Sequence, residues 1–167
     1  MNTSSTASTG PAGVELFRHA LATLAYRGGK AVRGAPADFG GFRSSDTTRT
    51  PANILAHIGD LMDWTLSILK GVPAWKDSRP IAWEEEIGRF HASIGSLDSF
   101  LASGKPDPLS LQKLFQGPIA DAFTHVGQLT LLRRMAGSPI RGENYFIADI
   151  ETGRLGPEQA PARREFG

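Results

Sequence analysis

Four stretches of the chain repeat apolar residues at intervals of three and four positions, and this periodicity restricts the fold more than any other feature. Such spacing gives an α-helix one apolar stripe, which must be buried against another element. The stretches cover residues 14–27, 50–71, 82–102 and 118–137. We find no alternation of polar and apolar residues long enough to build a sheet. The sequence therefore predicts an all-α fold, an up-down four-helix bundle with an irregular C-terminal tail.

Local signals predict where these helices begin and end. Thr50-Pro51 offers an N-cap followed by a proline at the first helical position. Gly28-Gly29 is expected to end the first helix. Gly117-Pro118 is expected to interrupt the chain after a short helix at residues 109–115, so that the last long helix begins at Pro118.

A length of 167 residues suits a single domain with a real hydrophobic core. We expect a disordered leader at residues 1–12, the helical domain at residues 13–150 and an irregular tail at residues 151–167. Tyr145, Phe146 and Ile147 are expected to pin the beginning of the C-terminal region to the helices.

The composition excludes several classes of function. The net charge of +1 gives no reason to expect a nucleic acid partner. The absence of cysteine excludes a disulfide framework, a zinc-thiolate site and a cysteine nucleophile, and it fits a reducing cytoplasm. The N-terminus lacks the features of a secretory signal, and no apolar run is long enough to span a membrane. We therefore expect a soluble cytoplasmic protein that acts on a small molecule.

Two of the four histidines lie on apolar helix faces, where a polar side chain needs an explanation. His57 belongs to the second helix and His125 to the last, where Asp121 precedes it by one helical turn. Helical bundles often build metal sites from such facing side chains. Two imidazoles and one carboxylate would leave positions open on zinc, nickel or iron, as in a catalytic site. His19 and His91 are expected to be surface and partly exposed residues, respectively.

Each of these residues also has an interpretation without a ligand. Asp121 would lie in the first turn of a helix that begins at Pro118, where an acid is favoured by the helix dipole. A histidine on an apolar face is more often a hydrogen-bonded core residue than a ligand. Gln128 could orient the ligand His125 through a hydrogen bond, or it could be a polar residue at the edge of the bundle.

The segments NILAHIGDLMDWTLSILKG and DAFTHVGQLTLLRRMAGSPI resemble the DinB/YfiT-like superfamily of metal-binding four-helix proteins. The resemblance extends over about residues 14–140. It implies one metal-binding histidine on the second helix, matched by His57, and an H-x-x-x-H pair on the last helix. His125, followed by Gly127-Gln128, matches the second histidine of that pair. Asp121 stands where the family usually has the first.

The resemblance also implies an activity, a cosubstrate and an assembly. Members resemble thiol-dependent transferases and isomerases in which a divalent metal activates a low-molecular-weight thiol, and dimers are common among them. The expected function is thus a metal-dependent thiol S-transferase, with Arg43 or Arg49 of the long loop at residues 34–50 available for an acidic cosubstrate. The alternatives are metal-assisted hydrolysis at the same residues, and a non-catalytic metal-binding or stress-response protein with an altered site. No individual catalytic residue beyond the metal ligands is predicted.

Overall fold

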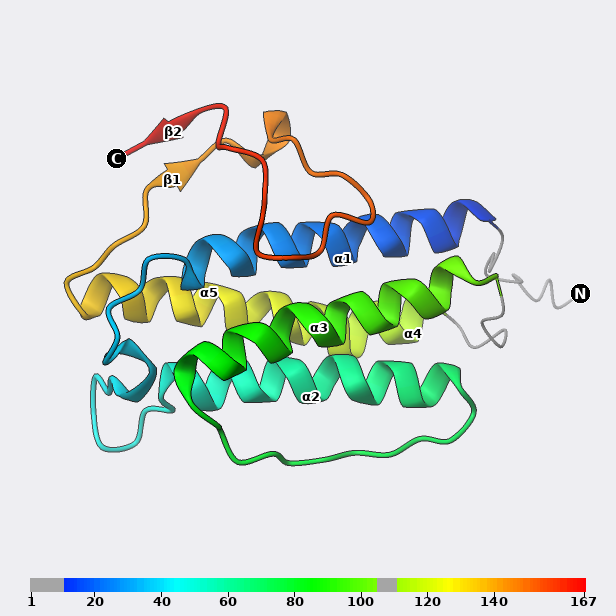
Figure 1. Ribbon diagram of the computed structural model, residues 1–167, viewed down its shortest axis with the longest axis horizontal. Coiled ribbons are helices and arrows are strands. Elements are labelled where there is room, and N and C mark those ends of the chain that lie inside the picture. Colours follow the sequence, from blue (N-terminus) through cyan, green and yellow to red (C-terminus); the bar gives the residue numbers. More distant parts are fainter. Residues whose placement is uncertain (1–10, 105–110) are drawn as a thin grey trace, which may run out of the picture.

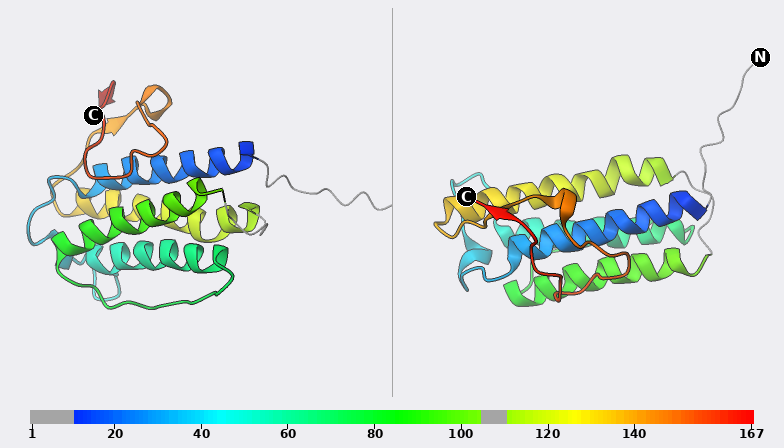
Figure 2. Two further views of the ribbon diagram at one scale, coloured as in Figure 1. Left: turned by 45° about the vertical axis from the view of Figure 1, so that its right-hand side comes forward. Right: turned by 90° about the horizontal axis from the view of Figure 1, so that it is seen from above.

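Four long helices lie side by side along the longest axis of the computed structural model, which describes residues 11–104 and 111–167 (Figures 1 and 2). They are α1 (Pro11–Val32), α2 (Pro51–Leu69), α3 (Trp83–Ala102) and α5 (Ala120–Met135). Helices α1 and α2 each pack against both α3 and α5. The expected all-α class is confirmed. Residues 1–10 of the expected leader lie outside the described residues, and residues 11 and 12 already belong to α1.

The second connection departs from the expected up-down order, because α2 and α3 run in the same direction (Figure 1). Residues 70–82 form an extended segment that returns along the outer side of α2, and we call it the crossover. Hydrogen bonds hold it there: the Ala74 amide donates to Ser67 Oγ, and the Ser78 amide donates to Asp60 Oδ2 at 2.8 Å. A connection this long lets α3 begin at the same end of the molecule as α2.

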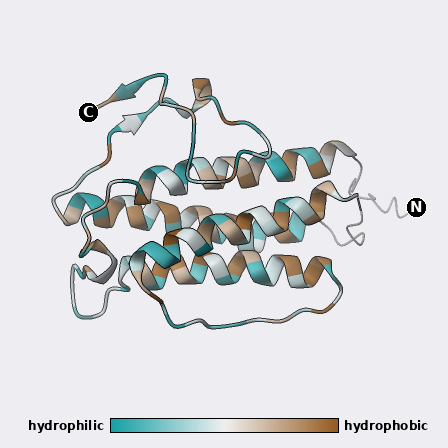
Figure 3. Ribbon diagram, in the orientation of Figure 1, coloured by the Kyte–Doolittle hydropathy of each residue, from teal (hydrophilic) through white to brown (hydrophobic). Residues whose placement is uncertain are grey.

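The apolar stripes of the four helices meet in one core. Figure 3 shows hydrophobic and hydrophilic residues alternating along each helix, as the sequence periodicity predicts. The largest fully buried side chains are drawn from α1, α2 and α3 and from a 3₁₀ helix at Phe39–Gly41. They include Phe39, Phe90, Leu21, Leu24, Ile54, Leu55, Ile58, Met62, Ile94 and Leu97.

Helix α1 continues past Gly28-Gly29, so the expected end of this helix is wrong. A Cβ atom at Gly28 would lie 2.4 Å from Phe90 Cζ, which shows that the glycine permits close contact between α1 and α3. The helix ends instead at Val32, before Gly34 with its positive φ of 61°. The buried Arg133 of α5 donates to the carbonyl oxygens of Ala31, Arg33 and Gly34 and so satisfies the exposed end of α1.

The last helix begins earlier than expected, because Gly117-Pro118 does not interrupt it. Helix α4 (Leu111–Leu114) passes through a π-helical turn (Phe115–Ile119) directly into α5. The amide of Ala120 bonds to the carbonyl oxygen of Phe115, five residues earlier, which is the spacing of a π-turn. Such a wide turn accommodates Pro118, which has no amide hydrogen to donate. Asp121 therefore lies within a continuous helix and not in the first turn of a new one.

The C-terminal region crosses α1 and forms a short antiparallel pair, β1 (Gly142–Glu143) with β2 (Glu165–Phe166), which the sequence did not predict (Figure 1). Glu143 is buried and accepts hydrogen bonds from the Tyr26 hydroxyl and from Lys30 Nζ, both at 2.6 Å. Tyr145 packs edge-on against Tyr26. Phe146 is 95% exposed, so the expectation that it anchors this region is wrong.

Within residues 11–104 and 111–167, no helix is both long enough and apolar enough to cross a bilayer.

The role of Gly28 leads to a first prediction. The substitution Gly28→Ala should destabilise the protein by about 1–3 kcal/mol, because the added methyl group overlaps the Phe90 ring. Gly88→Ala is the matched control, since Gly88 lies in α3 with open space at its Cβ position. It should be neutral or stabilise by up to about 1 kcal/mol through helix propensity. Denaturant unfolding of both variants measures the difference, and equal effects would show that the contact with Phe90 is unimportant.

Candidate metal centre

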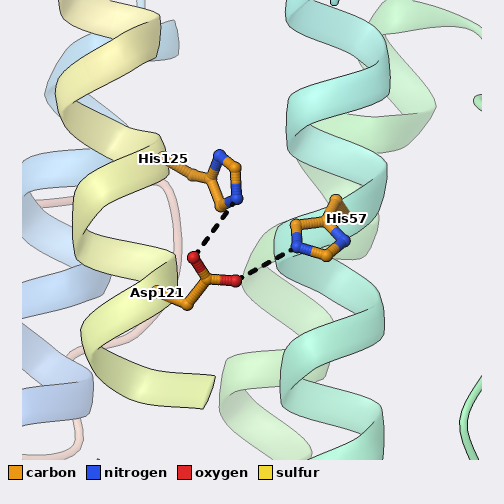
Figure 4. Close-up of side chains that lie close together, drawn as sticks. All are labelled: His57, Asp121 and His125. Atoms are coloured by element: carbon orange, nitrogen blue, oxygen red, sulfur yellow. Dashed lines mark hydrogen bonds and ion pairs between the residues drawn. The ribbon is translucent and has the colours of Figure 1, made fainter. Parts of the chain in front are cut away.

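Helices α2 and α5 bring His57, Asp121 and His125 together at one point of their interface (Figure 4). His57 Nε2 lies 3.2 Å from Asp121 Oδ2, and His125 Nε2 lies 3.5 Å from Asp121 Oδ1. The two imidazole rings meet edge to face, with centroids 4.7 Å apart. The i, i+4 spacing places Asp121 and His125 on one face of α5, and α2 supplies His57 from the facing side.

The three side chains differ in exposure. The side chains of His57 and His125 are 19% and 11% exposed, whereas that of Asp121 is 45% exposed. The sequence placed Asp121 on a buried face, but the carboxylate lies at the rim of the site, where water offsets part of its desolvation cost. The centre is therefore open on the side of Asp121.

These three residues could hold a metal ion. Each offers one ligand atom, and all of these atoms lie within 4.8 Å of one another. Ligand bonds of about 2.0–2.2 Å in a tetrahedral zinc site place two ligand atoms about 3.4 Å apart. The two nitrogen-to-oxygen distances of 3.2 and 3.5 Å are close to that separation, and they run to different oxygens of the Asp121 carboxylate. The residues present thus fit a divalent cation in the chemistry and the proximity of their ligand atoms.

Gln128 lies one turn beyond His125, with Oε1 3.0 Å from His125 Nδ1. With a proton on Nδ1, the ring donates to this oxygen and leaves the lone pair of Nε2 directed at the centre. A hydrogen bond of this kind fixes the tautomer and the orientation of a ligating histidine. Gln128 is exposed and in contact with His125, so both interpretations given by the sequence remain open.

The other two histidines lie away from this centre. His19 is exposed on α1, as expected. His91 is buried, so the expectation of a partly exposed residue is wrong. Its Nδ1 atom lies 2.7 Å from the carbonyl oxygen of Leu155. Burial lowers the pKa of His91, which favours the neutral ring. It connects α3 to the C-terminal region.

The crossover contributes an aromatic side chain that sequence reasoning missed. Trp75 packs edge-on against both His57 and Trp64, with ring centroids 5.7 Å away in each case. It is 48% exposed and so forms part of the outer wall beside His57. The signal was present in the length of the connection and in its tryptophan, since long loops in compact domains are often functional.

Asp60 holds the crossover in this position. Its carboxylate is buried and accepts hydrogen bonds from the amide and hydroxyl of Ser78 and from Arg89 of α3. Burial acts to raise the pKa of Asp60, but the hydrogen bonds from Arg89 and Ser78 and the charge of Arg89 outweigh it and keep the pKa below its usual value. The carboxylate therefore stays ionised.

A polar pocket of about 280 Å³ adjoins His57. The loop at residues 34–50 lines one part of it through Arg43, Thr47, Thr48 and Arg49, and α2 and the crossover line the rest. The sequence expectation that this loop supplies Arg43 and Arg49 beside the candidate site agrees with this arrangement. A larger apolar pocket of about 730 Å³ lies between α1 and the α4–α5 helix, and none of the three metal-site residues lines it.

Comparisons of the chain with family models, with curated proteins and with solved structures give no match.

The anchoring of the crossover gives a second prediction. Asp60→Asn should destabilise the protein by about 3 kcal/mol at neutral pH, because Arg89 then keeps only Glu86, at 4.0 Å, as a buried carboxylate partner. Asp63→Asn removes another carboxylate that contacts Arg89, but one that is 45% exposed, and it should cost less than about 1 kcal/mol.

The effect of Asp60→Asn should also depend on pH. The pKa of Asp60 in the folded state lies below its unfolded value of 3.8, so the stabilisation is complete above that value. It is lost as the pH falls through the folded pKa. Urea unfolding from pH 7 down to about pH 2 tests this, and a difference between wild type and Asp60→Asn that grows toward acid would contradict the assignment.

Proposed function

We propose that the protein is a metal-dependent enzyme of the thiol S-transferase type, built on a four-helix bundle of the DinB/YfiT-like kind. The proposal rests on one observation above all: His57, Asp121 and His125 converge from two helices with spacings that suit a divalent cation. The two stretches that resemble the superfamily contain these residues, and a polar pocket adjoins His57.

Each residue has a defined part in this proposal. His57, Asp121 and His125 would hold the cation, which could be zinc, nickel or iron(II). Gln128 keeps the Nε2 lone pair of His125 directed at the centre. A divalent cation bound there would lower the pKa of a thiol or water at its open positions, so that the anion forms near neutral pH. Trp75 covers one side of His57 and restricts access from that side.

One observation favours a second candidate, a non-catalytic protein with an altered site. Asp121 is within hydrogen-bonding distance of His57 Nε2 and close to His125 Nε2. With protonated imidazoles, these groups could satisfy one another and join α2 to α5 without a cation.

Metal-assisted hydrolysis would use the same residues as thiol transfer. We also retain the predictions of a cytoplasmic protein and a homodimer.

Metal retention tests whether these three residues form a metal centre or only a cation-free contact between α2 and α5. Protein purified without a histidine tag should contain one equivalent of a first-row metal, and His125→Ala should retain less than a tenth of it, since a chelating ligand is lost. His19→Ala is the matched control, because His19 is exposed and distant from the site, and it should retain the full amount. Elemental analysis gives the answer, and unchanged metal content in His125→Ala would exclude the site.

Gln128→Ala should weaken metal affinity by about 10- to 100-fold while leaving all three ligands in place. Competition with a chromogenic chelator measures this change. A variant with wild-type affinity would show that Gln128 does not orient His125.

The reaction class requires a direct assay. The metal-loaded protein should transfer a low-molecular-weight thiol to a generic electrophile such as chlorodinitrobenzene, and the activity should be confined to one thiol among those screened. Loss of the activity in His57→Ala and His125→Ala would connect it to the centre. Metal-loaded protein that hydrolyses an ester without any thiol would instead support the hydrolase.

A further inference from the structure

The polar pocket beside His57 carries two guanidinium groups that the metal site does not use. Arg43 and Arg49 belong to the loop at residues 34–50, and both line the pocket together with Asn53 and His57 of α2. We propose that this pocket binds a carboxylate group of a small acidic cosubstrate through Arg43 and Arg49. The inference names a substrate class for the proposed function and rests on it in that respect.

The loop holds Arg43 at the pocket through its own hydrogen bonds. Arg43 Nη1 donates to the carbonyl oxygen of Thr48 at 2.6 Å. The hydroxyl group of Thr48 bonds in turn to Ser44 at 3.0 Å and to Ser45 at 2.7 Å. This network closes the loop on itself and reduces the freedom of Arg43, so that less conformational entropy is lost when a ligand binds.

The beginning of α2 adds to the positive potential. Arg49 directly precedes Thr50, the N-cap whose hydroxyl accepts a hydrogen bond from the Asn53 amide. The N-terminus of this long helix carries roughly half a positive charge from its aligned peptide dipoles. Arg49 and Arg43 therefore line a pocket that also adjoins the first turns of α2.

Two acidic residues also line the pocket, and they do not cancel this potential equally. Asp60 already bonds to Arg89 and Ser78, so its charge is compensated. Asp77 is exposed and forms no ion pair within the described part of the chain. The lining residues thus include two guanidinium groups and one carboxylate without an ion pair, an excess of positive charge that favours an anionic ligand. Guanidinium groups bind carboxylates in a paired geometry that neutral groups do not reproduce.

The size and position of the pocket limit the size of the ligand and the direction in which it can extend. A volume of about 280 Å³ is close to the lower limit of about 300 Å³ for small-molecule sites, so it admits a short acidic fragment. His57 forms part of the pocket wall and part of the candidate metal centre. A cosubstrate held by its carboxylate at Arg43 and Arg49 would therefore extend its other end toward that centre.

Calorimetric titration of the purified full-length protein with succinate tests the proposal, and succinamide is the neutral ligand of the same size. Succinate should bind with saturation and more weakly as salt is added, and succinamide should not bind. Arg49→Gln should weaken succinate binding at least tenfold, and Arg43→Gln should also weaken it. Asp77→Asn should strengthen it by removing a repulsive charge. Arg79→Gln is the control, because Arg79 is exposed in the crossover but does not line the pocket.

The outcomes separate this inference from the proposed function. Failure of succinate to bind, equal binding of succinamide, or full binding by a folded Arg49→Gln variant would overturn the inference. Thermal unfolding verifies that each variant is folded, and Arg49→Gln remains informative if Arg43→Gln disturbs the loop. Metal content is measured on the same samples. Succinate binding by a protein that contains no metal would support the anion pocket and count against the metal-dependent enzyme. Bound metal without succinate binding would support the metal centre and overturn the anion pocket.

Discussion

The buried carboxylate of Asp60 joins α2, α3 and the crossover at one point. It lies on α2 and accepts hydrogen bonds from Arg89 on α3 and from the amide and hydroxyl groups of Ser78 in the crossover. Three separate segments thus share one ion-pair network, in which a charge without its partners would be costly. Because the crossover is held against α2, α3 can start beside the beginning of α2 and run parallel to it. The same restraint brings Trp75 to His57 and gives the polar pocket one of its walls.

The sequence predicted the helices better than their connections. Periodicity is a property of each helix alone, so the core residues and the starts of α2 and α3 agree with the structure. The function of Gly28 depends on Phe90, which is distant in sequence, and a glycine pair by itself is equally consistent with a helix end. In the same way, Pro118 normally stops a helix, and only a π-turn accommodates it here. The direction of α3 is reached through the long crossover, whose path along α2 no local pattern reveals.

The candidate centre was accessible to sequence reasoning because two of its residues are neighbours on one helix. The spacing of Asp121 and His125 is enough to place them together. His57 is far away in sequence, and its apolar surroundings and the resemblance to the superfamily were the grounds for adding it. Trp75 and Ser78 could not be placed, because they come from an extended segment whose path is fixed by tertiary contacts. The exposure of Asp121 was also misjudged, since the periodicity of one helix does not show where its neighbour ends.

The π-turn at Phe115–Ile119 has a consequence for how one helix serves two neighbours. An extra residue in a turn offsets the preceding segment by about 100° relative to the position it would occupy in an unbroken α-helix. Leu111 and Leu114 can therefore pack toward α1 and the core, while Asp121 and His125 face α2. The π-turn thus sets the direction in which α4 faces independently of the direction in which α5 faces. Deleting a single residue there would remove this offset, so that either the apolar face of α4 or the metal-site face of α5 would turn away from its neighbour.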